Sequence, residues 1–124
     1  MDCTIDVRAG SRVALVHALD APLADARDAN DLIATVFYAQ DCQKIVLPRT
    51  LLSPAFFQLR TGLAGEILQK FTNYRMALAI VGDFSKEKSE PLQAFIHECN
   101  RGRQVCFAAT QAQALDWLHG LDAR

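Results

Sequence analysis

The feature that most constrains the fold of this chain is the run Met76–Val81, which is apolar without alternation. A strand with one face in water alternates apolar and polar residues, whereas a strand covered on both faces is apolar throughout, as in a parallel sheet. Lys44–Pro48 and Gln104–Ala108 have the same character. We therefore predict that these three segments lie side by side as buried strands.

Segments with helical periodicity separate these strands. Apolar residues recur at helical spacing over Asp25–Gln40, Thr61–Asn73 and from Pro91 to Asn100, which predicts three amphipathic helices. Between the first two helices, Ser53-Pro54 is a good start for a single helical turn, with Ser as the cap and Pro at the first position. Thr110 is suited to cap a last helix.

The N-terminal part predicts a hairpin. Cys3–Arg8 and Arg12–His17 read as strands, and Ala9-Gly10-Ser11 between them is a turn signal. Strands that alternate with helices are joined by right-handed crossovers in a parallel sheet. We predict an α/β fold with a mostly parallel sheet of four to five strands, an N-terminal hairpin and about four helices.

Composition excludes several classes of protein. The chain has 124 residues, of which 51% are hydrophobic, and its formal net charge is -1. This length predicts one domain over residues 1–124, with a core that needs no disulfide or metal. No basic excess points to nucleic acid, and no apolar run approaches the roughly 18 residues of a membrane span. We therefore expect neither a nucleic-acid nor a membrane partner.

The cysteines indicate a reducing compartment. Cys3, Cys42, Cys99 and Cys106 include no C-x-x-C pair, and the start Met1-Asp2 has no charged leader followed by an apolar stretch. Without a secretion signal, reduced thiols in the cytoplasm are the plain interpretation. We expect a cytoplasmic protein.

A distinctive block carries a family resemblance. It runs from Phe56 to Phe71 and is followed by Asn73-Tyr74-Arg75, Ala79–Phe84, Phe95–Glu98 and Asn100-Arg101-Gly102. These segments resemble the bacterial domain-of-unknown-function family 4180, over about Arg12 to Leu118. The resemblance implies no particular activity.

The order of elements also resembles the sulfate transporter and anti-sigma factor antagonist (STAS) domain, many members of which are regulatory binding modules. Some members carry a phosphorylatable Ser or Thr at the start of the helix after the third strand. The matching residue here is Ser53 or, as a second choice, Thr50. The Asp-Ser-x-Gly pattern of those switches is absent, and likeness of fold alone is weak evidence of function.

Ligands of open parallel sheets bind beyond the carboxyl ends of the strands. Residues expected at that edge are Asp20, Arg49, Thr50, Ser53, Gly82, Asp83, Ser85 and Thr110. We single out Arg49, Ser53 and Asp83 as binding residues, because a helix start offers backbone N–H groups to an anion and an arginine can pair with it. The alternative is that Ser53 and Thr110 only cap helices and that Gly82-Asp83 is a turn.

The opposite edge is predicted to be basic. It should gather Lys70, Asn73, Tyr74, Arg75, Asn100, Arg101 and Arg103. We select Lys70, Asn73, Tyr74, Arg101 and Arg103 as a second candidate surface, for an acidic partner or a phosphorylated ligand. Alternatively, these cations only offset helix dipoles.

Gly62 and Gly65 fall within a helical pattern, where each costs up to about 1 kcal/mol relative to Ala. Close packing of this helix against another backbone would offset that cost. The backbone could belong to a second copy, with Phe56-Phe57 adding apolar surface, so a homodimer is among the expectations.

We identify no catalytic or metal-ligating residues and expect no cofactor. His97 and Glu98 are adjacent and point about 100° apart on a helix, and no nucleophile, zinc or phosphate-loop motif is present. The sequence favours a non-enzymatic regulatory or protein-binding module. The alternative is a small ligand-binding protein or enzyme that uses the edge near Arg49, Ser53 and Asp83.

Overall fold

The computed structural model describes residues 1–121. Its strands and α-helices alternate after an initial hairpin, as predicted. In chain order they are β1 (Asp2–Arg8), β2 (Ser11–Ala18), α1 (Ala26–Ala34), β3 (Lys44–Pro48), α2 (Leu63–Asn73), β4 (Ala77–Val81), α3 (Glu90–Asn100), β5 (Val105–Ala108) and α4 (Gln111–Gly120). A π-helical turn, Thr35–Ala39, extends α1, and 3-10 turns at Arg49–Leu51, Pro54–Phe57 and Leu59–Thr61 fill the segment between β3 and α2.

The strands form one sheet in the order β1-β2-β3-β4-β5, which is also their order in the sequence. β1 and β2 are antiparallel, and every later pair is parallel. Val46 lies opposite Ala79, and Ala79 lies opposite Cys106. The predicted α/β class, the hairpin and the adjacency of the three apolar segments are therefore confirmed.

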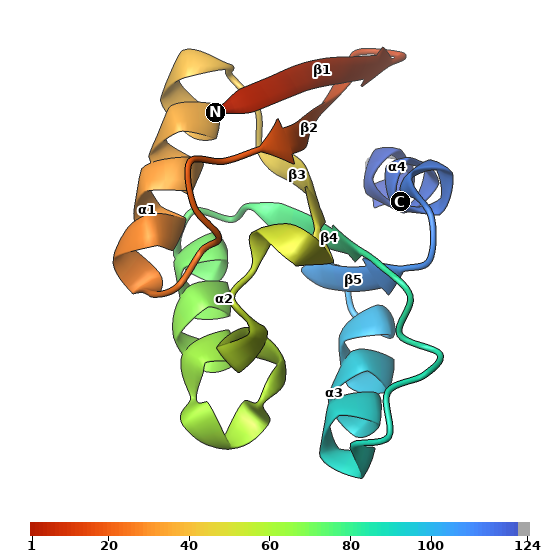
Figure 1. Ribbon diagram of the computed structural model, residues 1–124. Helices are drawn as coiled ribbons and strands as arrows, with labels where there is room; N and C mark the ends of the chain where they lie inside the picture. The colour runs from red at the N-terminus through yellow and green to blue at the C-terminus, as the bar shows by residue number, and fades with distance from the viewer. Residues whose placement is uncertain (122–124) are drawn as a thin grey trace.

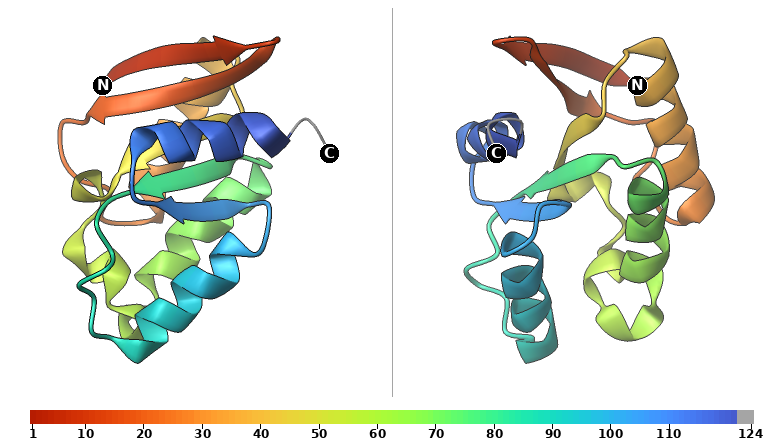
Figure 2. Two further views of the ribbon diagram at one scale, coloured as in Figure 1. Left: turned by 90° about the vertical axis from the view of Figure 1, so that its right-hand side faces the viewer. Right: turned by 180° about the vertical axis from the view of Figure 1, so that it is seen from behind.

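The helices are divided unequally between the two faces of the sheet. α1, α2 and α3 lie on one face, and α4 alone lies on the other (Figures 1 and 2). Each right-handed crossover leads to the next strand in the same direction, so successive helices fall on the same side. α4 follows the last strand and folds back over the second face, where it contacts β2, β3, β4 and β5.

The core is correspondingly split by the sheet. On the three-helix side, residues such as Ile45 and Ile80 pack with Ile33 of α1 and Phe71 of α2. On the other side, alternate strand residues pack against α4; they are Val13, Leu15, Val46, Ala79, Cys106 and Ala108. Both faces of the central strands are covered, which explains why those strands have no polar residue apart from Lys44 at the start of β3. No helix within the described residues is long and apolar enough to cross a membrane.

Two details of the helices differ from expectation. The helix predicted over Asp25–Gln40 changes to π-helical geometry at Thr35. Gly62 lies just before α2 in the left-handed conformation, with φ +77°, rather than inside the helix. A side chain other than glycine rarely adopts this conformation, so backbone geometry explains Gly62.

Gly65 has no close packing within the chain. A Cβ atom at Gly65, which is exposed, would meet nothing within 4 Å. Phe56, expected to add exposed apolar surface, is fully buried. Phe56 therefore adds nothing to an apolar surface for a second copy, and packing of Gly65 against a second copy stays a prediction.

Candidate functional site

Arg49 is the centre of the site at the carboxyl edge of the sheet. It directly follows β3, and the neighbouring strand β4 ends at Val81, so Arg49 lies beside the loop that leads from β4 to α3. Its Nη1 donates to the backbone oxygen of Asp83 at 2.8 Å, and its Nη2 donates to Oε1 of Glu87 at 2.8 Å. The arginine thus ties the β4–α3 loop to the end of β3.

Two aromatic rings also hold the guanidinium. Its central carbon lies 4.7 Å from the ring centre of Phe57 and 4.7 Å from that of Phe84. Arginine favours such stacking because its planar cation is attracted to ring faces and is weakly hydrated. Phe84 also packs edge-on against Phe107 of β5 at 5.2 Å. These contacts fix both the position and the orientation of the charge.

Gly82 leaves room for the side chain of Arg49. A Cβ atom built on Gly82 would lie 2.4 Å from Cδ and 2.7 Å from Cγ of Arg49. Cγ and Cδ of Arg49 cannot move away easily, because the guanidinium is held by two hydrogen bonds and two aromatic rings. Gly82, predicted as an edge residue, therefore acts by leaving room for Arg49.

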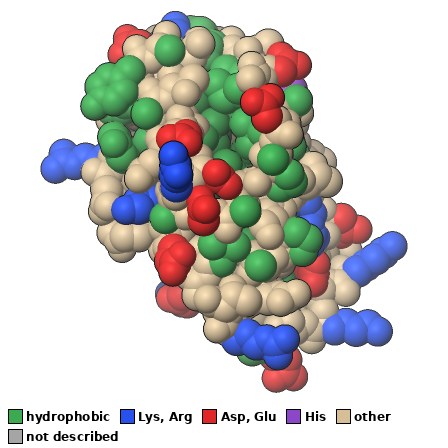
Figure 3. All heavy atoms as spheres, turned by 60° about the vertical axis from the view of Figure 1, so that its left-hand side comes forward, with side chains coloured by type: hydrophobic (Ala, Val, Ile, Leu, Met, Phe, Trp, Pro, Cys, Tyr) green, Lys and Arg blue, Asp and Glu red, His purple; other side chains and the backbone are tan. Residues whose placement is uncertain are grey.

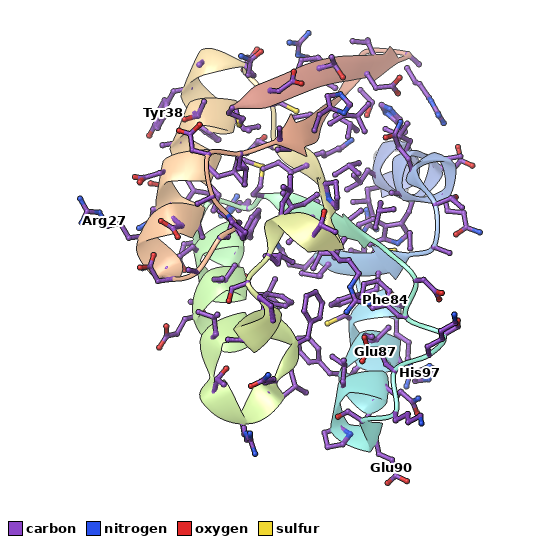
Figure 4. All side chains as sticks on the ribbon, in the orientation of Figure 1. Arg27, Tyr38, Phe84, Glu87, Glu90 and His97 are labelled. Atoms are coloured by element: carbon purple, nitrogen blue, oxygen red, sulfur yellow. The ribbon has the colours of Figure 1, made fainter. Side chains whose placement is uncertain are left out.

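A cavity of about 520 Å³ opens next to Arg49. Its walls come from the 3-10 turns between β3 and α2 and from the start of α3, namely Arg49, Pro54, Phe57, Gln58, Leu59, Arg60, Glu87, Ser89, Pro91 and Leu92. Figure 4 shows Phe84 and Glu87 beside α3, with Arg27 far away on α1 and Tyr38 on the π-helical turn that follows α1. A cavity of several hundred cubic ångströms with apolar walls and a few polar groups suits a small ligand.

The two arginines of this cavity differ in whether an acidic side chain neutralises them. Glu87 neutralises Arg49 in an ion pair whose side chains are each about three-tenths exposed, 28% and 29%. Arg60 is exposed and makes no hydrogen bond or ion pair with another residue of the range 1–121. Ser89 caps α3 by accepting a hydrogen bond from the Leu92 amide. One positive charge and the positive end of a helix dipole therefore face the cavity.

Asp83 contributes its backbone rather than its carboxylate. Its side chain accepts hydrogen bonds from the hydroxyl of Ser85 at 2.6 Å and from the Ser85 amide at 3.0 Å. These bonds, first the hydroxyl and then the amide, lower the pKa of Asp83 below its usual value. The carboxylate is thus committed to a turn, and only the carbonyl of Asp83 meets Arg49.

Ser53 is placed away from the cavity lining. It caps the 3-10 turn Pro54–Phe57, with its Oγ accepting from the Ala55 amide at 3.3 Å, and its own amide donates to Leu23 at 2.9 Å. The turn has 4 residues, too few to build an appreciable helix dipole. Ser53 itself is outside the lining, and its neighbour Pro54 is the residue that lines the cavity.

The residues of the predicted basic edge have varied local roles. Asn73 accepts from Gln69 at 2.8 Å, and the ring of Tyr74 packs against Phe37 at 6.1 Å. Arg101 approaches Glu98 at 3.9 Å, Arg103 donates to the backbone oxygen of Leu121 at 2.7 Å, and Lys70 is half-buried near the end of α2.

Asn100, also expected at that edge, pairs with strand β5. It donates to the backbone oxygen of Phe107 at 3.3 Å and accepts from the Phe107 amide at 2.7 Å. Over the face seen in Figure 3, basic and acidic side chains are interspersed. No bonded contact joins the five selected residues into one cluster within the described part of the chain.

Sequence reasoning missed four members of the Arg49 site. Phe57 and Arg60 lie in the block that carries the family resemblance, and Phe84 and Glu87 follow Gly82-Asp83 in the next loop. Two phenylalanines and a glutamate, each a few residues beyond a strand end, could have been recognised as partners of an arginine at the same edge. Among the described residues no group of three or more His, Cys, Asp or Glu side chains is placed to hold a metal ion.

Comparison with models of protein families identifies the family of this α/β chain. It matches the family described as a domain of unknown function, DUF4180, over residues 8–118. The chain therefore belongs to this family. Searches of curated proteins and of solved structures found no match.

Proposed function

We propose that this protein is a binding module that takes a small anionic ligand, a carboxylate or a phosphate, in the cavity beside Arg49. The observation that carries the proposal is the combination of a cavity of about 520 Å³ with an arginine in its wall, Arg60, that no acidic residue of the range 1–121 neutralises. Of the two sequence interpretations, the ligand-binding alternative gains support, because the edge is hollow rather than flat.

The walls suggest how the ligand is held. Phe57, Leu59 and Leu92 offer apolar contact, and the start of α3 and Arg60 offer positive potential. Arg49 is prepositioned by its rings and by Glu87, so the site loses little side-chain entropy when it binds. An anion with a short apolar body would contact the apolar residues of the cavity and place its charge near Arg60 and the start of α3.

Binding is favoured over chemistry at this cavity by its residue types. Among the described lining residues there is no histidine or cysteine, and the hydroxyl of Ser89 caps a helix. A nucleophile would need an adjacent base, and the carboxylate in the lining, Glu87, is paired with Arg49. The resemblance of the element order to STAS domains supports a regulatory role. A cytoplasmic setting is supported by four free thiols in the described residues, Cys3, Cys42, Cys99 and Cys106.

An NMR titration tests the proposal. Uniformly labelled protein is titrated with succinate, glutarate, benzoate, phenyl phosphate and inorganic phosphate, and amide shifts are followed. We expect at least one probe to shift amides near Arg60, Phe57 and Ser89, and Arg60→Ala to weaken binding about tenfold, because one charge-assisted hydrogen bond contributes about 1.5 kcal/mol or more.

Arg27→Ala is the matched control, because Arg27 is also exposed but lies on α1, away from the cavity (Figure 4). It should bind as the unmodified protein does. If no probe shifts those amides at millimolar concentration, or if Arg60→Ala and Arg27→Ala weaken binding equally, the proposal is wrong.

A further inference from the structure

A second polar cluster lies at the other end of the sheet, on the face covered by α4. His119, near the end of α4, contacts Asp6 of β1 through Nε2 at 2.8 Å and Ser11 at the start of β2 through Nδ1 at 2.8 Å. Nζ of Lys44, at the start of β3, donates to Oγ of Ser11 at 2.8 Å. Four elements thus contribute one continuous chain of side chains.

Donor chemistry limits the directions of the hydrogen bonds in this chain. An ammonium only donates, and an ionised carboxylate only accepts. Lys44 therefore donates to Ser11, and Asp6 accepts from Nε2–H of His119. When the imidazole is neutral, Nδ1 carries the lone pair and accepts the hydroxyl hydrogen of Ser11. In this tautomer the basic nitrogen is directed at the serine.

This arrangement is the ground state that serine nucleophiles use: hydroxyl to imidazole, imidazole to carboxylate. The imidazole is shielded, with 7% of the side chain exposed, and Asp6 is 34% exposed. Ser11 and Lys44 also line a cavity of about 220 Å³, together with Gly10, Arg12, Asp41, Cys42 and Gln43. A small reagent can therefore approach the serine from the side away from its base.

We infer that Ser11 is a reactive nucleophile that accepts small acyl groups from esters, with His119 as its base and Asp6 as the residue that positions His119. One lone pair of Ser11 Oγ accepts the hydrogen bond from Lys44, and the hydroxyl hydrogen is donated to His119. A second lone pair of Oγ is left to attack the carbonyl carbon of the ester. Lys44 adds positive charge where the oxyanion forms. This activity is independent of anion binding at the Arg49 cavity.

The chemical step balances without a further cofactor. Oγ of Ser11 forms a bond to the carbonyl carbon while its proton passes to Nδ1 of His119. The ester C–O bond then breaks, and the leaving alcohol takes that proton. A water molecule releases the acyl group as a carboxylic acid by the same steps, with His119 as base.

An alkyl fluorophosphonate tests the inference on the full chain. Attack by Oγ forms a P–O bond and expels fluoride, so mass spectrometry of the intact protein and its peptides reports the labelled residue. We expect a single label on Ser11, its loss in Ser11→Ala, and labelling roughly 100-fold slower in His119→Gln, the scale of general-base catalysis. p-Nitrophenyl acetate should release one rapid equivalent of p-nitrophenol from the unmodified protein only.

The chain contains its own control. Nε2 of His17 lies 2.8 Å from Oγ1 of Thr4, also a hydroxyl–imidazole pair, but both residues are exposed and no other hydrogen-bonded partner of His17 is described. His17→Gln should be labelled at the unmodified rate. Asp6→Asn serves if His119→Gln fails to fold, and it should slow labelling without changing the circular dichroism spectrum. A folded protein that leaves Ser11 unlabelled, or a folded His119→Gln labelled as fast as His17→Gln, overturns the inference.

Discussion

The polar clusters at the two ends of the sheet differ in how the chain builds them. The partners of Arg49 lie 34 and 38 residues further along, within one crossover of the same sheet edge. His119 lies 108 residues from Ser11 and 113 from Asp6, and they meet only because α4 folds back over the second face. The first cluster depends on the regular crossovers, and the second depends on the final helix.

The clusters also differ in the kind of chemistry that they permit. Arg49 is a fixed charge stacked on two rings beside the larger cavity, an arrangement suited to binding. In the His119 chain the imidazole is shielded and is hydrogen-bonded through both nitrogens, an arrangement suited to moving a proton. A protein of this size can thus keep a recognition site and a reactive group apart by placing them at opposite strand ends.

The largest expected effect concerns the space that Arg49 needs. Gly82→Ala should destabilise the protein by about 2–3 kcal/mol, because overpacking at an immobile side chain costs this much. Gly65→Ala, where a Cβ meets nothing within 4 Å, should instead stabilise it by about 0.5–1 kcal/mol. Urea unfolding of the two variants measures both. Equal effects would show that Arg49 is not rigidly held.

A smaller effect is expected at the His119 cluster. Asp6→Ala should cost about 1–2 kcal/mol of unfolding free energy, because it leaves the N–H of a shielded imidazole without its acceptor. Asp116→Ala breaks the exposed ion pair with Arg8, of 2.7 Å, and should change stability much less than Asp6→Ala does. Chemical denaturation distinguishes them. If Asp6→Ala proves as mild as Asp116→Ala, the chain of hydrogen bonds is not a structural unit.

The smallest effect concerns Cys106, which belongs to the α4 face. Burial, followed by the nearby Cys99, raises the pKa of Cys106 from 9.0 to about 11. The folded protein therefore holds this proton more tightly than the unfolded chain, so its contribution to stability is complete below pH 9 and is lost between about pH 9 and 11. Cys106→Ala should flatten that decline in stability, measured by denaturation across this range. A decline of the same slope in the variant would contradict the shift.

Much of the fold could be predicted from the sequence because its strands are covered on both faces. The unbroken apolar runs around Val46, Ile80 and Val105 identified three adjacent strands, and periodic apolar residues identified the helices. The ends of the helices were harder to predict from the sequence. The turn to π-helix at Thr35 and the left-handed Gly62 depend on backbone geometry that hydrophobic periodicity does not encode.

The candidate site was predicted only in part. The rule that ligands bind beyond strand carboxyl ends located Arg49 and Asp83, but not the stacked rings that hold the arginine. Ser53 drew attention through its capping signature, although it belongs to a turn of 4 residues. The meeting of Asp6, Ser11 and His119 left no local signal, because it depends on which face of the sheet the last helix covers.

The single helix on the second face has a consequence for how the molecule comes apart. Strands arranged in chain order contact mainly their neighbours, so such a sheet could open one strand at a time from either side. α4 packs across β2 to β5, so separating any one of these four strands from the sheet also breaks contacts with α4. It should make unfolding concerted, with amide hydrogens of the first and last parallel strands exchanging through the same global event.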